Sequence, residues 1–351
     1  MNISFPNQYD RINLLDRSKF ILVTGATGAV GPRVVHALHQ AGCQIRAFSI
    51  DVPTTGIFPQ NVEVLLGDVT DKAAVQSAMQ GVDAVIHMAA LLHIVNPPPE
   101  LREKYERVNV GGTATVVEAA IKAGVKRVVL FSTIAVYGPS EGCVLNELSP
   151  THPDTFYAQT KLDAEQIVLN ARSSNGQPLG TVLRLGAVYG SRIKGNYEWL
   201  TRALERHRFI PIGGGRNRRT LVCDKDAARA AVLAVQHPPD AAGRIHNVSD
   251  GGFHTLNEII AAICAGLGRR PPRFSLPVAP VRFVAGMLED GARFFGRHSP
   301  ITRVTVDKYT EDIAVDGSLI QRKLGFVPQY DLKTGWEETI REMRGKDSFE
   351  F

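Results

Sequence analysis

The segment Thr24-Gly25-Ala26-Thr27-Gly28-Ala29-Val30-Gly31 decides the fold class of this 351-residue chain. It follows a short apolar run at residues 20–24 and leads into residues 30–40, where apolar side chains recur at helical spacing. Gly42 then marks the expected end of the helix. A strand that leads directly into a glycine-rich turn and a helix is the context in which this spacing predicts a dinucleotide site.

Each glycine of the turn has its own expected role. Gly25 allows the tight turn, Gly28 lets the backbone approach a pyrophosphate, and Gly31 lets the helix pack close to the strand. The start of the helix adds N–H donors and a partial positive charge, which favour phosphate. The turn residues predicted to bind the dinucleotide are Gly25, Thr27, Gly28, Ala29, Val30 and Gly31.

Strand-like and helical segments alternate through the first half of the chain. Strands are predicted at 44–49, 62–66, 84–87, 128–131 and 182–185, and helices from Asp71 onward, at 100–123 and at 156–170. The alternation predicts an α/β fold, a Rossmann-type doubly wound parallel sheet with helices on both faces. After about residue 186 Pro and Gly become more frequent, which predicts a smaller, interleaved C-terminal substrate-binding region. The predicted divisions are an N-terminal extension (1–18), a dinucleotide-binding domain that carries the catalytic residues (19–185) and a mainly substrate-binding region (186–351).

Composition and charge argue against several classes of protein. The net charge of +5 is not concentrated in a long basic run, so no nucleic-acid partner is expected. The four cysteines form no CxxC pair and the histidines show no ligand spacing, so no metal site is predicted. The N-terminus lacks the pattern of a secretory signal, and we expect a cytoplasmic protein.

Residues 276–295 form the longest apolar-looking stretch of the chain. Four charged residues interrupt it, namely Arg282, Glu289, Asp290 and Arg293, so it is not expected to span a bilayer. We predict an amphipathic helix that packs on the body of the protein.

A second motif, Tyr157 and Lys161, predicts proton transfer. Residues four apart share one face of a helix, and the Lys161 ammonium is expected to lower the phenol pKa of Tyr157. Tyr157 would then act as acid or base near neutral pH while a hydride moves to or from a nicotinamide ring. Thr133 ends a predicted strand, and its hydroxyl would orient the reacting oxygen. YxxxK alone is a weak signal, but its order after the glycine-rich turn and Ser132-Thr133 is a strong one.

Further residues are predicted to hold the dinucleotide. Asp51 follows the second strand and would bind the adenosine ribose, which favours NAD. Arg33 is the nearby cation that would instead hold a 2′-phosphate, so NADP is not excluded. Asp68, followed by Val69, either accepts from the adenine amino group or caps the next helix. The small residues Ala89 and Ala90 would let the backbone pass close to the ribose and nicotinamide.

These motifs resemble those of the extended short-chain dehydrogenase/reductase family, in its NAD-dependent epimerase/dehydratase type. The resemblance rests on the TGxxGxxG turn, Thr133 with Val136-Tyr137-Gly138, the Tyr157/Lys161 pair and Arg184-Leu185-Gly186-Ala187-Val188-Tyr189-Gly190, and it extends from about Phe20 to Pro328. It implies a Rossmann-type domain, bound NAD(P), a Thr-Tyr-Lys catalytic set and Asn109 as a support for the active site. It also implies a homodimer paired through the helices at 100–123 and 156–170.

The choice of substrate depends on the C-terminal half. Asn196 and Arg219 lie in segments that look like those that meet the diphosphate in sugar-nucleotide enzymes, and Arg303 is a second candidate for this role. Ala187 and the stretch 273–288 look more like the hydroxysteroid dehydrogenase branch. Ile134-Ala135 supplies no acid/base pair after Thr133, which argues against a 4,6-dehydratase.

The reading that the resemblance favours is an NAD(P)-dependent epimerase that acts at C4 of a nucleotide-diphosphate sugar of the UDP-hexose type, through a transient 4-keto sugar. Two alternatives stay open. One is a sugar-nucleotide 4-ketoreductase, and the other is a dehydrogenase of a steroid-like or other secondary alcohol.

Overall fold

A computed structural model describes residues 19–92, 100–236, 242–295, 299 and 302–347 of the chain. The N-terminal extension predicted for residues 1–18 lies outside the described residues. Within them, seven parallel strands form one sheet in the order β10-β6-β5-β4-β1-β2-β3. Their bounds are β1 (Phe20–Thr24), β2 (Gln44–Ser49), β3 (Glu63–Leu66), β4 (Ala84–His87), β5 (Arg127–Thr133), β6 (Gly180–Leu185) and β10 (Arg244–Val248).

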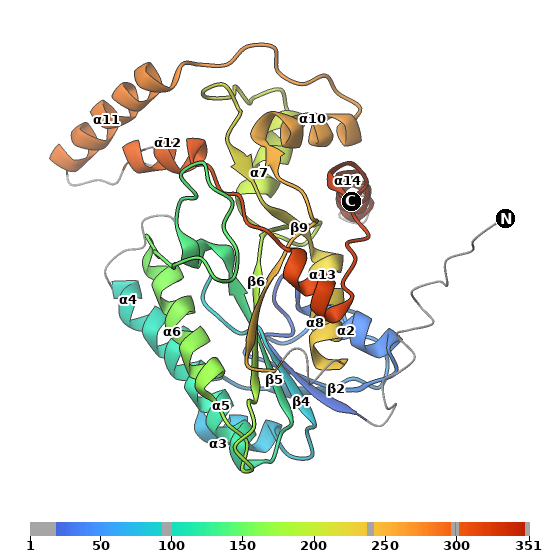
Figure 1. Ribbon diagram of the computed structural model, residues 1–351. Helices are drawn as coiled ribbons and strands as arrows, with labels where there is room; N and C mark the ends of the chain where they lie inside the picture. Colours follow the sequence, from blue (N-terminus) through green and yellow to red (C-terminus); the bar gives the residue numbers. More distant parts are fainter. Residues whose placement is uncertain (1–18, 93–99, 237–241, 296–298, 300–301, 348–351) are drawn as a thin grey trace.

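Helices cover both faces of this sheet, which confirms the predicted doubly wound α/β fold (Figure 1). One face packs against helices whose buried side chains are mostly Val, Leu and Ala, namely α2 (Gly31–Gln40), α8 (Asp224–Gln236) and α13 (Ser318–Leu324). The other face packs against α3 (Lys72–Ala78), α5 (Gly112–Lys122) and α6 (Phe156–Asn170). Strands buried on both faces are mostly apolar, and β1 and β4 are almost fully buried.

The predicted long helix at 100–123 contains a wider turn that its sequence did not indicate. α4 (Glu100–Tyr105) continues through a π-helical segment, Glu106–Gly111, into α5. Such segments are rare and often lie at functional sites. This one contains Asn109, so the extra turn width sets the direction of a side chain expected near the active site.

The strand order places the topological switch point between β1 and β4. From β1 the chain winds outward through β2 and β3, and it then returns to β4 and continues through β5 and β6 in the other direction. In open parallel sheets, ligands bind outside the carboxyl ends of the strands at this point. Thr24, His87 and Thr133 end β1, β4 and β5, so they lie along the same edge.

The chain after residue 186 is divided between this sheet and a second layer. α8, β10 and α13 complete the sheet and its cover. The second layer has its own core around Trp336, Tyr189 and Ile259. Its elements are β7 (Ala187–Tyr189), β8 (Arg218–Arg219), β9 (Leu221–Cys223), β11 (His254–Thr255), α7 (Asn196–Glu205), α10 (Leu256–Leu267), α11 (Val278–Phe294), α12 (Arg303–Thr310) and α14 (Leu332–Asp347). A short 3₁₀ turn, Ile134–Tyr137, follows β5.

The helix predicted near residues 276–295 forms as α11, but the expectation that it packs on the body is wrong. Its principal contact is α12, and within α11 only Ala285 and Gly286 are buried. Phe283 and Met287 are 70% and 62% exposed. None of the helices seen in the described residues combines the length and the hydropathy that a membrane span requires.

Gly31 offers a direct test of the turn geometry, because a Cβ at this position would overlap the carbonyl oxygen of Ala26. The close contact is therefore with the turn itself rather than with the strand. We expect Gly31→Ala to lower the free energy of unfolding by at least about 2 kcal/mol, since backbone cannot yield as a flexible side chain can. Urea titration followed by circular dichroism measures the change.

Gly345→Ala is the matched control. It lies in α14, and a Cβ there would meet no atom within 4 Å. Because Ala is the better helix former, we expect a gain of about 0.5–1 kcal/mol. Equal effects of the two substitutions would contradict the tight turn.

Candidate active site

The glycine-rich turn is wedged between the ends of β2 and β4. Gly25 has a φ of +69°, and its N–H donates to Phe48 O at 2.8 Å. A Cβ on Gly25 would lie 2.8 Å from the amide nitrogen of Ala89, so only glycine lets the turn approach the segment after β4 this closely. The Thr27 amide donates to the Ser49 hydroxyl at 3.0 Å. The turn is therefore held in place from both sides.

The apex of the turn and the start of α2 have the features that a phosphate group needs. Gly28 is exposed, and Ala29 and Val30 are half-buried. Val30 precedes α2 without capping it through a side chain. N–H groups at a helix start attract anions together with the helix dipole. These features suit the pyrophosphate of a dinucleotide, and the contacts predicted for the turn residues stay a prediction.

The charge of Arg33 is paired within the protein, which argues against its alternative role as the ligand of a 2′-phosphate. Its Nε donates to Asp224 Oδ2 at 3.0 Å, and its Nη2 pairs with Glu342. These two carboxylates join α2 to α8 and α14 and take up the charge of the guanidinium. Asp51 is exposed two residues beyond the end of β2, and its role as a ribose ligand stays a prediction.

The two roles considered for Asp68 are separated by the structure. Asp71, not Asp68, caps α3, and its Oδ1 accepts from the amides of Ala73 and Ala74. Asp68 Oδ1 accepts from the Thr70 amide at 2.9 Å, and the residue is half-buried. Val69 is buried beside Gly112 at the start of α5. The capping alternative for Asp68 is thus wrong, and the adenine role stays a prediction.

His87 connects the turn to the π-helical segment, a function that the sequence did not reveal. Its Nδ1 lies 2.7 Å from Thr24 Oγ1, and its Nε2 lies 3.0 Å from Thr113 Oγ1. Because Thr113 donates its own proton to Asn109 O, Nε2 of His87 must carry the proton and Nδ1 must accept. Thr24 Oγ1 in turn accepts from the Ala89 amide at 3.4 Å. Burial lowers the pKa of His87 to about 3, and the nearby Lys161 charge adds to this effect, so the ring is neutral.

Asn109 supports the segment after β4, as the family resemblance implied. Its Oδ1 accepts from the Leu91 amide at 2.8 Å, and its Nδ2 donates to Leu91 O and to Thr160 Oγ1. Ala89 and Ala90 precede this anchor and are half-buried. Asn109 therefore ties the loop after β4 to α6, one residue before Lys161.

Thr133, Tyr157 and Lys161 come from two elements that pack together. Thr133 ends β5, and its Oγ1 accepts from the Ala135 amide at 3.1 Å. Tyr157 and Lys161 lie on α6, where Lys161 is 3% exposed. The Tyr157 ring stands at 67° to that of Tyr105, with the centroids 6.5 Å apart.

The expectation that the Lys161 ammonium lowers the phenol pKa of Tyr157 is wrong for this chain without a bound cofactor. Burial raises the pKa of Tyr157 to about 12, and the neighbouring Tyr105 adds to the rise. Burial also lowers the pKa of Lys161 to about 8, against which the carboxylate of Glu165 acts. Desolvation is the largest cause of both shifts, because it penalises the charged form of each group.

Glu165 and Arg184 form a buried ion pair close to the predicted catalytic residues. They are 0% and 3% exposed. Arg184 Nη2 lies 2.6 Å from Glu165 Oε2, and Arg184 Nε also donates to this carboxylate. The Ser132 hydroxyl donates to Glu165 Oε1 at 2.5 Å. The pair thus joins α6, one turn after Lys161, to β6, and Ser132 adds β5, the strand that ends at Thr133.

A sequence signal for this pair existed but was missed. Arg184 interrupts an otherwise apolar buried strand, and such a charge needs a buried partner. Glu165 follows Lys161 by four residues on the same predicted helix face.

The predicted substrate residues lie in the second layer or beside it. Arg219 ends β8, and its Nη2 donates to the carbonyls of Lys308 and Tyr309. Asn196 begins α7 and is exposed. Arg303 instead begins α12, and its side chain pairs with Glu289 and Asp290 of α11. Within the described residues, no group of three or more His, Cys, Asp or Glu side chains is arranged to hold a metal ion.

The pKa of Lys161 predicts how stability changes with pH. A lysine whose pKa falls from 10.5 to about 8 on folding binds fewer protons when folded, so it destabilises the chain below about pH 8. This cost is about 3 kcal/mol and disappears as the pH rises through 10.5. We expect Lys161→Met to raise the free energy of unfolding most at neutral pH and to lose this advantage near pH 10.5. Urea titrations across this range measure it.

Lys122→Met provides the control, because Lys122 is exposed at the end of α5. It should change stability little and without this dependence on pH. A Lys161→Met protein less stable than the wild type at neutral pH would count against the buried charge.

Comparison with known proteins agrees with this geometry. A UDP-glucose 4-epimerase of Vibrio cholerae is 28% identical over 92% of this chain and 95% of its own length. An N-acetyl-alpha-D-glucosaminyl-diphospho-ditrans,octacis-undecaprenol 4-epimerase of Escherichia coli O157:H7 is 26% identical over 92% of this chain and 94% of its own. Among solved structures, MoeE5 in complex with UDP-glucose and NAD superposes with a TM-score of 0.73 at 25% identity, over 93% of this chain and 99% of its own.

The family profile described as NAD dependent epimerase/dehydratase matches residues 21–249, which include the glycine-rich turn, Thr133, Tyr157 and Lys161. The match agrees with the enzyme class and with the NAD expected from the sequence. The chain belongs to the NAD dependent epimerase/dehydratase family.

Proposed function

We propose that this protein is an NAD-dependent epimerase that inverts C4 of a sugar carried on a diphosphate, with a nucleotide-diphosphate sugar as the substrate. The observation that supports the proposal is the Tyr157/Lys161 pair on α6, in which Lys161 is buried and Tyr157 half-buried. This helix packs against the strand that ends at Thr133. Proton transfer beside a dinucleotide turn is the chemistry these groups serve.

In this mechanism the chain's residues hold and move the proton. Tyr157 takes the proton of the C4 hydroxyl and later returns it, while Thr133 donates its own hydroxyl proton to the C4 oxygen. Thr133 can do so because its Oγ1 only accepts from the Ala135 amide. Bound NAD would accept the C4 hydride and return it to the other face of the sugar. Its oxidised form would also add positive charge to the site.

The raised pKa of Tyr157 explains why Lys161 must be charged. A phenol whose pKa is about 12 loses its proton at neutral pH only when positive charge lies close by. Glu165 works against the desolvation of Lys161 and so favours its ammonium form. Arg184 and Ser132 hold Glu165 in place, which makes these residues positioning residues in the proposed reaction.

Arg219 and Asn196 are proposed to bind the diphosphate. The contacts of Arg219 with Lys308 O and Tyr309 O use Nη2, and a guanidinium has further donors that can meet a phosphate oxygen. Arg303 is committed to Glu289 and Asp290, so we leave it out of the proposed site. The named substrates of two relatives share the diphosphate but differ in its carrier, nucleoside or polyprenyl. Arg219 would recognise this shared group.

The 4-ketoreductase and the secondary-alcohol dehydrogenase remain the alternatives, and net turnover of the cofactor distinguishes them from an epimerase. An epimerase recycles its hydride, so NADH absorbance stays constant while the sugar changes. A homodimer paired through the helices α4, α5 and α6 and a cytoplasmic location stay predictions.

The central experiment offers the purified protein UDP-glucose and UDP-N-acetylglucosamine and follows the C4 configuration by NMR. We expect conversion to the C4 epimer without net NADH formation. Tyr157→Phe should lower kcat at least about 100-fold and leave bound NAD detectable, because it removes the proton carrier alone. Turnover within a few-fold of the wild type would show that Tyr157 is not the acid/base. Net oxidation of a neutral alcohol, without epimerisation, would favour the dehydrogenase.

Arg219→Ala tests the diphosphate site. Losing a charge-assisted contact should raise KM for the nucleotide sugar about 10- to 100-fold, with a smaller change in kcat. Arg216→Ala is the matched control, because Arg216 is exposed in the same loop. An unchanged KM for Arg219→Ala would place the diphosphate elsewhere.

A further inference from the structure

α11 has its apolar side turned away from the protein. A helix on the surface of a globular protein normally buries its apolar stripe and exposes its charges. In and directly after α11, six large apolar side chains are each more than half exposed: Phe283 (70%), Val284 (53%), Met287 (62%), Leu288 (53%), Phe294 (85%) and Phe295 (75%).

These side chains form one continuous stripe. At about 100° per residue, the six exposed residues and Pro280 and Gly291 fall within a sector of about 140°. The sector contains no charged residue. Monomeric proteins seldom expose a continuous apolar surface of this kind unless it contacts something.

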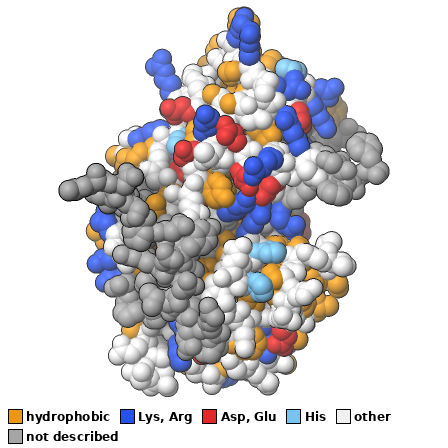
Figure 2. All heavy atoms as spheres, turned by 90° about the vertical axis from the view of Figure 1, so that its right-hand side faces the viewer, with side chains coloured by type: hydrophobic (Ala, Val, Ile, Leu, Met, Phe, Trp, Pro, Cys, Tyr) orange, Lys and Arg blue, Asp and Glu red, His pale blue; other side chains and the backbone are white. Residues whose placement is uncertain are grey.

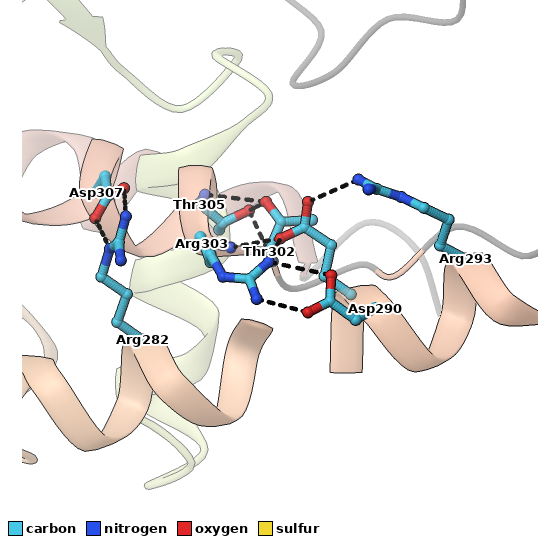
Figure 3. Close-up of polar contacts among 8 residues, drawn as sticks. Arg282, Asp290, Arg293, Thr302, Arg303, Thr305 and Asp307 are labelled. Carbon is cyan, nitrogen blue, oxygen red and sulfur yellow. Dashed lines mark hydrogen bonds and ion pairs between the residues drawn. The ribbon is translucent and has the colours of Figure 1, made fainter. Parts of the chain in front are cut away.

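The opposite, polar side of α11 is bound to α12 (Figure 3). Arg282 makes a two-pronged ion pair with Asp307, at 2.7 and 3.1 Å. Arg303 donates to Asp290 Oδ2 at 2.6 Å, and its backbone amide donates to Glu289. A Cβ on Gly286 would overlap the guanidinium group of Arg303, so α11 and α12 are in close contact. The ion pairs fix the orientation that leaves the stripe outside.

The surroundings of the stripe are basic. Residues 269–295 contain five arginines and two acidic residues, and both acids contact Arg303. Arg273 is exposed just before the helix, whereas Arg293 is exposed on the polar side of α11, where it pairs with Glu289. Figure 2 shows the opposite side of the molecule, which is turned away from α11, and there Lys and Arg side chains are mixed with Asp and Glu side chains over the upper part.

We propose that α11 is an interfacial helix that docks this protein on an anionic lipid bilayer. An aromatic and aliphatic stripe enters the boundary between headgroups and acyl chains, while flanking arginines meet lipid phosphates. The helix lies in the plane of the membrane and does not cross it, in agreement with its interrupted sequence and length.

Charge distinguishes a bilayer from a second copy of the chain. A two-fold contact through this stripe would bring the same arginine-rich surroundings of two copies together, and like charges repel. An anionic surface instead complements them. The proposed docking is independent of the reaction, because none of the stripe residues belongs to the proposed active site.

Vesicle co-sedimentation of the full chain tests the proposal. We expect the wild type to sediment with vesicles of phosphatidylglycerol and phosphatidylcholine in equal parts, and to bind phosphatidylcholine vesicles more weakly. The double variant Phe283→Glu/Leu288→Glu should lose at least about tenfold in partitioning, since it places charges in the stripe. Its circular dichroism and urea midpoint should match the wild type, because both side chains are exposed.

Leu148→Glu/Val327→Glu is the matched control, with the same change of charge at two exposed apolar residues outside α11. It should bind vesicles as the wild type does, apart from a small electrostatic loss. Equal binding by the stripe variant, or no binding by the wild type, would overturn the proposal. So would a wild-type dimer that the stripe variant converts to a monomer in sedimentation velocity, because a second copy would then cover the helix.

Discussion

The candidate active site depends on one buried ion pair, Glu165 with Arg184. Removing two charges from water is costly, and the cost is offset only where every donor and acceptor finds a partner. Here Ser132 donates to Glu165, and Arg184 lies over the Tyr137 ring at 4.7 Å. The Tyr137 hydroxyl donates to the side-chain Oδ1 of Asn247, and the backbone amide of Asn247 donates to the Glu147 carboxylate. One network therefore joins β5, β6, α6 and β10 directly behind Thr133 and Lys161.

A second network of neutral groups organises the dinucleotide end. His87 accepts a hydrogen bond from Thr24 and donates one to Thr113, and the Thr113 hydroxyl donates to Asn109 O. This chain of hydrogen bonds has a single direction because each hydroxyl has one proton to donate. It links the ends of β1 and β4 to the π-helical segment, and Asn109 extends the link to α6 through Thr160. The two networks meet near Lys161, whose charge helps keep His87 neutral.

The second layer combines two different kinds of surface. Its core around Trp336 is formed by buried apolar side chains that include those of α10 and α14, as in any globular region. α11 and α12 instead join through ion pairs and leave an apolar stripe outside. α12 also contacts Arg219 through Lys308 O and pairs through Lys308 with Asp154. The same short helix thus borders both the proposed diphosphate site and the proposed membrane surface.

The sequence by itself determined the elements whose signals are local. The glycine-rich turn, the apolar runs of β1, β2 and β4 and the full extent of α6 follow from turn chemistry and periodicity over a few residues. It also led to the prediction of Thr133, Tyr157 and Lys161 as the reacting set, which depends on residue types and spacing and stays a prediction. Only the tertiary structure decided where Arg33 and Arg303 direct their charge, which partner Arg184 meets, and that the stripe of α11 faces outward. It also reversed the expected shift in the pKa of Tyr157. These properties depend on burial and on partners distant in the chain, and the periodicity of one segment carries no information about either.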